Sequence, residues 1–185
     1  MTLRNRALGQ LGAALAMCSL AAACTPQRAP DPAPSPTSAS TTPAETQLER
    51  QTRLDFQEAE KAYRSFRAEY SRLAIAGGAD RPTSVMKENA SGPYLEVMVD
   101  FLAQTRAAGK KQQGVVRIAY VRPESHSPRE VTLQVCEDGT KVRNVAEDGH
   151  ISKGVAAKIV LYVRPIDGRW KVWNGDDEEV SSCVA

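Results

Sequence analysis

AKIVLYVRPIDGRWKVW, residues 157–173, is the stretch that decides the fold. Apolar residues recur at every second position on both sides of Asp167-Gly168, over residues 157–163 and again over 170–172. Such alternation is typical of half-buried β-strands, and Asp-Gly between two alternating runs favours a tight hairpin because both residues accept positive φ. The stretch therefore predicts two antiparallel strands joined by a short turn.

The same period of two appears earlier in the second half of the chain. Residues 116–120 and 131–135 alternate between apolar and polar side chains, and two more Asp-Gly pairs, Asp138-Gly139 and Asp148-Gly149, separate the runs. We therefore expect a series of hairpins that forms one antiparallel sheet.

Helical periodicity precedes the hairpins. An apolar, largely aromatic stripe repeats at spacings of three and four, which places it on one face of a helix. Its members are Phe56, Ala59, Tyr63, Phe66, Tyr70 and Leu73. Arg67 and other charged residues occupy the remainder of the helix surface, and Gly77-Gly78 ends the helix. A helical turn over 83–88 and a second long helix from Pro93 to Gly109 follow.

Helices followed by consecutive hairpins predict an α+β domain, with N-terminal helices packed on one face of an antiparallel sheet. Residues 47–185 have a normal length for one domain with one core, and we expect them to form a single domain.

The first 23 residues have the layout of an export signal. Arg4 and Arg6 precede a mostly small, apolar run that ends in Ala21-Ala22-Ala23-Cys24. The run falls short of the roughly 20 strongly apolar residues of a transmembrane helix, and its flanks fit a cleaved signal. We expect cleavage before Cys24, lipid attachment to Cys24, and anchoring at the extracytoplasmic face of a bacterial cell membrane. Plain secretion and an uncleaved anchor are the alternatives.

Residues 24–46 are expected to be the lipidated cysteine and a disordered linker. Six of the eleven prolines lie in this segment, among Ala, Ser and Thr, so it has almost no apolar surface to bury. Without Arg4 and Arg6, the chain has 22 basic and 22 acidic residues. This balance argues against nucleic acid or acidic lipid as the principal partner.

Cys136 and Cys183 are the two cysteines left once the signal is removed and Cys24 is acylated. An exported location favours their oxidation, so we predict a structural disulfide that holds the C-terminal segment. Such a bridge is worth about 4 kcal/mol in the chain-entropy model. Two free buried thiols are the alternative.

Catalytic signatures are missing from the sequence. It contains no Gly-x-Ser-x-Gly elbow, phosphate-binding loop, dinucleotide glycine pattern or His-Glu-x-x-His helix. His126 and His150 fall in expected loops without a partner at metal-ligand spacing. The acidic run 176–179 lacks the spacing of a calcium loop and is interpreted as a solvated turn. We therefore predict no catalytic residue, no metal site and no cofactor.

The order of these features resembles the nuclear-transport-factor-2-like superfamily. The aromatic-striped helix, the second helix ending at Gly109, the hairpins and the motif Asp167-Gly168-Arg169-Trp170-Lys171-Val172 carry the resemblance over residues 50–183. The chain looks most like small bacterial lipoproteins of that superfamily, in which a strand cysteine like Cys136 pairs with a final cysteine like Cys183. The resemblance implies a cone, in which helices cross a strongly curved sheet that can enclose a pocket.

Three functions are compatible with this interpretation. We favour a non-enzymatic accessory module that docks another protein or a membrane complex. The alternative is a binder of a small apolar ligand, whose pocket uses some of five aromatic residues: Tyr63, Tyr70, Tyr94, Trp170 and Trp173. The third is an isomerase, cyclase or hydrolase on the same cone, which would require a buried carboxylate or histidine.

Overall fold

The computed structural model describes residues 45–184. The predicted signal peptide, Cys24 and nearly all of the predicted linker lie outside these residues. Three helices come first in the described chain: α1 (Gln47–Ala76), α2 (Ser84–Asn89) and α3 (Gly92–Ala107). Seven strands follow: β1 (Lys111–Gln113), β2 (Arg117–Ser127), β3 (Glu130–Asp138), β4 (Arg143–Val145), β5 (Ile151–Lys153), β6 (Ala156–Ile166) and β7 (Arg169–Val180).

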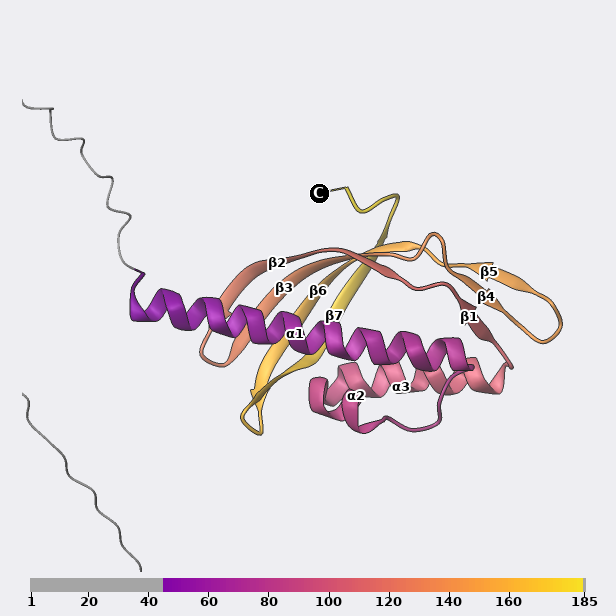
Figure 1. Ribbon diagram of the computed structural model, residues 1–185, viewed down its shortest axis with the longest axis horizontal. Helices are drawn as coiled ribbons and strands as arrows, with labels where there is room; N and C mark the ends of the chain where they lie inside the picture. The colour runs from indigo at the N-terminus through magenta and orange to yellow at the C-terminus, as the bar shows by residue number, and fades with distance from the viewer. Residues whose placement is uncertain (1–44, 185) are drawn as a thin grey trace, which may run out of the picture. The chain divides into compact units, whose positions relative to one another are not determined.

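The long strands form a four-stranded antiparallel sheet in the order β2-β3-β6-β7, and the short ones a three-stranded sheet in the order β1-β4-β5. Figure 1 shows the long strands arching over α1, with all three helices on the concave side of the sheet. The predicted α+β class, with N-terminal helices on a curved antiparallel sheet, is confirmed. None of the helices between residues 45 and 184 offers a hydrophobic stretch of sufficient length to span a bilayer.

The predicted hairpin at Asp167-Gly168 is present between β6 and β7. Both turn residues have positive φ, 53° and 73°, and Ile166 pairs with Arg169. Asp148-Gly149 likewise separates β4 from β5. Asp138-Gly139 behaves differently, since it ends β3 and leads into the small sheet.

Local signals at both ends explain the length of α1. Thr46 and Glu49 form a capping box at its start, and Gly77, with φ of 100°, ends it in the left-handed region. Between these ends the predicted stripe faces the sheet. Tyr63 and Phe66 are fully buried there, packed with Leu133 and Leu161 of the sheet.

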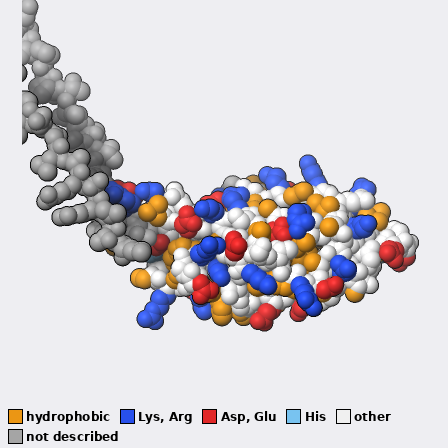
Figure 2. Space-filling view, turned by 60° about the horizontal axis from the view of Figure 1, so that its bottom comes forward, with side chains coloured by type: hydrophobic (Ala, Val, Ile, Leu, Met, Phe, Trp, Pro, Cys, Tyr) orange, Lys and Arg blue, Asp and Glu red, His pale blue; other side chains and the backbone are white. Residues whose placement is uncertain are grey.

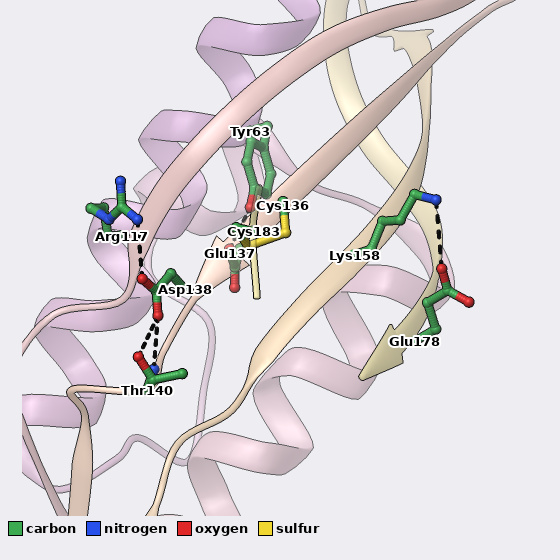
Figure 3. The surroundings of a disulfide bond; sticks show 9 residues. All are labelled: Tyr63, Arg117, Cys136, Glu137, Asp138, Thr140, Lys158, Glu178 and Cys183. Atoms are coloured by element: carbon green, nitrogen blue, oxygen red, sulfur yellow. Dashed lines mark hydrogen bonds and ion pairs between the residues drawn. A yellow bond between two sulfur atoms is a disulfide. The ribbon is translucent and has the colours of Figure 1, made fainter. Parts of the chain in front are cut away.

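The disulfide between Cys136 and Cys183 is present, with the two Cα atoms 5.7 Å apart, so the prediction is confirmed. Because side chains alternate along a strand, Cys136 points to the convex face of the sheet and the next residue, Glu137, to the helix side. Figure 3 shows Cys183 meeting Cys136 while Glu137 meets Tyr63. The bridge therefore fixes the segment after β7 on the convex face.

A close contact after α1 fixes the position of α3. Gly78 has a φ of +89°, and a Cβ at this residue would lie 2.2 Å from the carbonyl oxygen of Leu102 in α3. The amide of Ala79 donates to the same oxygen at 3.3 Å. A side chain at position 78 would therefore push the turn away from α3.

We predict that Gly78→Ala destabilises the domain far more than Gly149→Ala. Gly149 has a similar φ of +83°, but a Cβ at this residue would meet nothing within 4 Å, so it controls for backbone strain alone. Strain costs about 1–2 kcal/mol at either position, and only Gly78→Ala adds the clash with α3. Urea unfolding of both variants measures the difference. Equal losses would contradict the proposed close contact.

Candidate functional site

The space between α1, α3 and the sheet is hollow near the C-terminal end of α1. Two depressions, of about 400 and 290 Å³, open there and share one wall. The shared wall consists of Arg67, Tyr70, Phe101, Glu137 and Ala157. We call the two depressions together the interior cavity.

The two arms of the interior cavity differ in chemistry. The larger, which we call the small-sheet arm, extends toward the short strands and is lined by both apolar and polar groups, the polar ones including Gln104, Lys110 and Gln112. The smaller, the α3 arm, runs beneath α3 toward β7 and is lined mainly by apolar and aromatic groups, including Tyr94 and Met98. The cavity therefore combines a mainly apolar arm with an arm of mixed polarity.

A buried polar cluster lies in the shared wall. The Tyr63 hydroxyl and the Arg67 Nε both donate to Oε1 of Glu137. Tyr63 and Arg67 are four residues apart on α1, so they lie on one face of the helix and reach the same position of β3. The side chains of Arg67 and Glu137 are only 11% and 10% exposed. Arg67 lies outside the apolar stripe, and a carboxylate on the sheet draws its side chain inward.

Burial and charge set the protonation of the surrounding groups. Burial, together with the Glu137 charge, raises the pKa of Tyr63 and of Tyr94 well above the usual value. Burial also raises the pKa of Tyr70. Desolvation opposes the charge on Arg67, but its contacts with Glu137 prevail and raise the pKa of Arg67. The phenols therefore stay protonated near neutral pH, and Arg67 stays charged.

One atom of this cluster lacks a partner. Arg67 Nη1 is the only buried side-chain nitrogen or oxygen among the described residues without a hydrogen bond. The guanidinium lies over the Tyr70 ring, with Cζ 5.0 Å from the ring centroid. Buried donors are nearly always satisfied, so this unpaired N–H group is an exception among the described residues.

Two of the five aromatic residues proposed for a pocket line the interior cavity, and the other three lie elsewhere. Tyr70 and Tyr94 line the interior cavity. Tyr63 lies in the core and contributes through its bond to Glu137. Trp170 instead lines a separate depression between α1 and the β6–β7 hairpin. Trp173 packs on the first turn of α3, where a Cβ at Gly92 would lie 2.5 Å from its ring.

The predicted loop position of His126 is wrong. His126 lies in β2, and its Nε2 is 2.8 Å from Asp55 Oδ2 of α1. The sequence suggested that Pro123 would end the strand. Instead β2 continues past Pro123 through a shift in register between Pro123 and Ser125, so His126 falls within the strand. His150 follows the exposed turn between β4 and β5, as predicted.

The acidic run Asp176-Asp177-Glu178-Glu179 is exposed, but it lies in β7 and not in a turn. Pairing with β6 holds it extended, and Lys158 lies 3.6 Å from Glu178 (Figure 3). Within residues 45–184, no group of three or more His, Cys, Asp or Glu side chains is arranged to hold a metal ion. Figure 2 shows positive and negative side chains interspersed on the face it presents.

No protein-family model and no curated protein matches the chain. Several solved structures are similar to it in fold. The intermembrane space region of the chloroplast protein ARC6 has 15% identity and a TM-score of 0.47, over 67% of this chain and 96% of that one. An NTF2-like family protein from Streptomyces avermitilis has 11% identity and a TM-score of 0.45, over 71% and 99%.

An NTF2-like protein with a cystatin-like fold from Novosphingobium aromaticivorans has 13% identity and a TM-score of 0.44, over 73% of this chain and 90% of that one. The resemblance stated from the sequence concerns the same superfamily. Likeness at this level describes the arrangement of helices and strands and says nothing about activity.

Asp138 anchors the turn beside the small-sheet arm. It accepts hydrogen bonds from the hydroxyl and the amide of Thr140, at 2.6 and 3.1 Å, and from Arg117 at 3.1 Å (Figure 3). The Thr140 hydroxyl and Arg117 lower the pKa of Asp138 to about 2. The ionised carboxylate therefore stabilises the folded domain.

We predict that the stability advantage of the wild type over Asp138→Asn depends on pH. The folded pKa lies below the ordinary value of 3.8, so the advantage is complete above that value and disappears as pH falls toward 2. Unfolding free energies measured across this interval test it. Asp148→Asn, at the other Asp-Gly turn, controls for the substitution itself. An advantage that stayed constant down to about pH 2 would refute the assigned role.

Proposed function

We propose that the protein is a membrane-anchored extracytoplasmic lipoprotein whose domain binds a small molecule in the interior cavity. The hollow space between α1, α3 and the sheet carries this proposal. Its arms, of about 290 and 400 Å³, have the size of small-molecule sites, and such sites combine an apolar lining with a few fixed polar groups. The α3 arm and the cluster at Glu137 supply these two components.

The mouth of the cavity supports the same role. Phe101 lines both arms yet is 50% exposed, and Val97, one turn earlier on α3, is 51% exposed. Exposed apolar side chains beside an open cavity would gain burial when an apolar ligand enters. The accessory, protein-docking role favoured from the sequence depends on the predicted anchor and linker, which lie outside the described residues. Ligand binding therefore has the stronger support.

We propose binding without catalysis. Glu137 is the buried carboxylate of the cavity, and it is held by Tyr63 and neutralised by Arg67. The Tyr63 hydroxyl and the Arg67 Nε both donate to Oε1, so this oxygen is already occupied. Glu137 then acts as a fixed hydrogen-bonding group.

Blocking the cavity should abolish ligand binding. Ala157 lies in the shared wall, so Ala157→Phe would fill the junction of the two arms. We expect native mass spectrometry of the protein purified from its own host to show a co-purified small molecule, and Ala157→Phe to lose it. Ala107→Phe, at an exposed position of α3, controls for the added ring and should keep it. A wild-type protein without any bound molecule, when gently isolated, would count against the proposal.

Removing the lipidation site should release the protein from the membrane. We expect Cys24→Ala to lose incorporation of labelled fatty acid and to leave the membrane fraction, since attached acyl chains provide the anchor. Cys18→Ala, within the predicted signal, should retain both properties. A wild-type protein that incorporates no fatty acid would disprove the anchor and leave the proposal for the cavity standing.

A further inference from the structure

We infer that the ligand carries a neutral head group with one hydrogen-bond acceptor and one donor, as in a primary amide or lactam, and that this group binds Arg67 and Glu137. The inference rests on the proposed function and specifies the chemistry of its ligand. It follows from the hydrogen bonds, the charges and the apolar surface of the interior cavity.

Arg67 supplies the donor. Its Nε is bound to Glu137, whereas its Nη1 is buried without an acceptor among the described residues. A buried donor left without an acceptor costs about 1–3 kcal/mol. Nη2 likewise makes no hydrogen bond within the described residues, and it is not enclosed as Nη1 is. Because Arg67 lines both arms, a carbonyl oxygen placed at their junction would accept from this group.

Glu137 supplies the acceptor. Both of its side-chain hydrogen bonds within the described residues reach Oε1, and Oε2 receives none. A carboxylate can accept about four hydrogen bonds, so Oε2 is available to an N–H group. Arg67 and Glu137 are bonded to each other, which places the open donor and the open acceptor in one ion pair.

The charges of the cavity favour a neutral head group. The charges of Arg67 and Glu137 cancel. The two linings contain two more charged residues, Lys110 in the small-sheet arm and Asp177 in the α3 arm, and their charges are opposite. An anionic head at the junction would meet the Glu137 carboxylate, and a cationic one the Arg67 guanidinium. A buried net charge is costly, so a group that pairs with both partners without adding charge fits best.

The lining of the α3 arm determines which kind of ligand body fits there. Tyr94, Met98 and Phe101 of α3 face Ile159 of β6 across this arm. The Tyr94 ring is held in place by Phe66, with ring centroids 5.2 Å apart. A flat apolar or aromatic body would therefore lie in the α3 arm while its amide group reaches the shared wall.

Four probes of similar size and different head groups test the inference: benzamide, benzoate, benzamidinium and ethylbenzene. Protein NMR titrations give both the affinity and the residues whose signals shift. We expect benzamide to bind about tenfold more tightly than the other three, which corresponds to about 1.4 kcal/mol, with shifts at Ala157 and Phe101. Preference for benzoate, or equal binding of benzamide and ethylbenzene, would overturn the inference and leave the binding function standing.

Glu137→Gln provides the matched variant. It leaves Arg67 as an uncompensated charge at the junction, so the preference should change from benzamide to benzoate. Glu130→Gln, on the same strand and paired with Arg164 outside the cavity, should keep the wild-type preference. If Glu137→Gln does not fold, the wild-type probe series decides alone. Binding of none of the four probes would count against the proposed function itself.

Discussion

The buried ion pair between Arg67 and Glu137 is the contact on which the arrangement of the interior depends. It joins the middle of α1 to a central strand, and Tyr63 completes the hydrogen bonding from one turn earlier on the helix. Loss of one partner of a buried pair costs about 3–5 kcal/mol, because the other charge is left without compensation. The pair therefore fixes the rotation of α1 over the sheet and, with it, the wall of the cavity.

Strand β3 connects the two faces of the domain through consecutive residues. Cys136 binds the C-terminal segment covalently on the convex face, and Glu137 holds α1 on the concave face. The strand is paired on both sides, with β2 and β6, so neither residue can shift along the chain without breaking the ladder. A rigid central strand with a charged group at the cavity suits a site whose polar groups must stay fixed while the mouth at Phe101 is open to ligands.

Local sequence patterns predicted most of the fold because they act over a few residues. The Asp167-Gly168 turn, the stripe on α1 and the glycine end at Gly77 each depend on neighbours in the chain. The cavity and the burial of Arg67 depend on residues far apart in sequence, and no local pattern encodes them. One signal was available: the alternation of Val131, Leu133 and Val135 continues to position 137, which predicts a carboxylate facing the core. Arg67, the partner of this carboxylate, could not be identified from the sequence, because the pairing depends on how α1 crosses β3 in the folded domain.

A double-mutant cycle on this pair tests the account most directly. Arg67→Met and Glu137→Leu replace the two charges by apolar side chains of similar size, and urea unfolding gives the stability of each single variant and of the double variant. We predict that each single variant loses about 3–5 kcal/mol, and that the double variant loses far less than the sum because no uncompensated charge stays buried. Losses that simply add, or single variants close to the wild type, would show that the pair does not organise the interior.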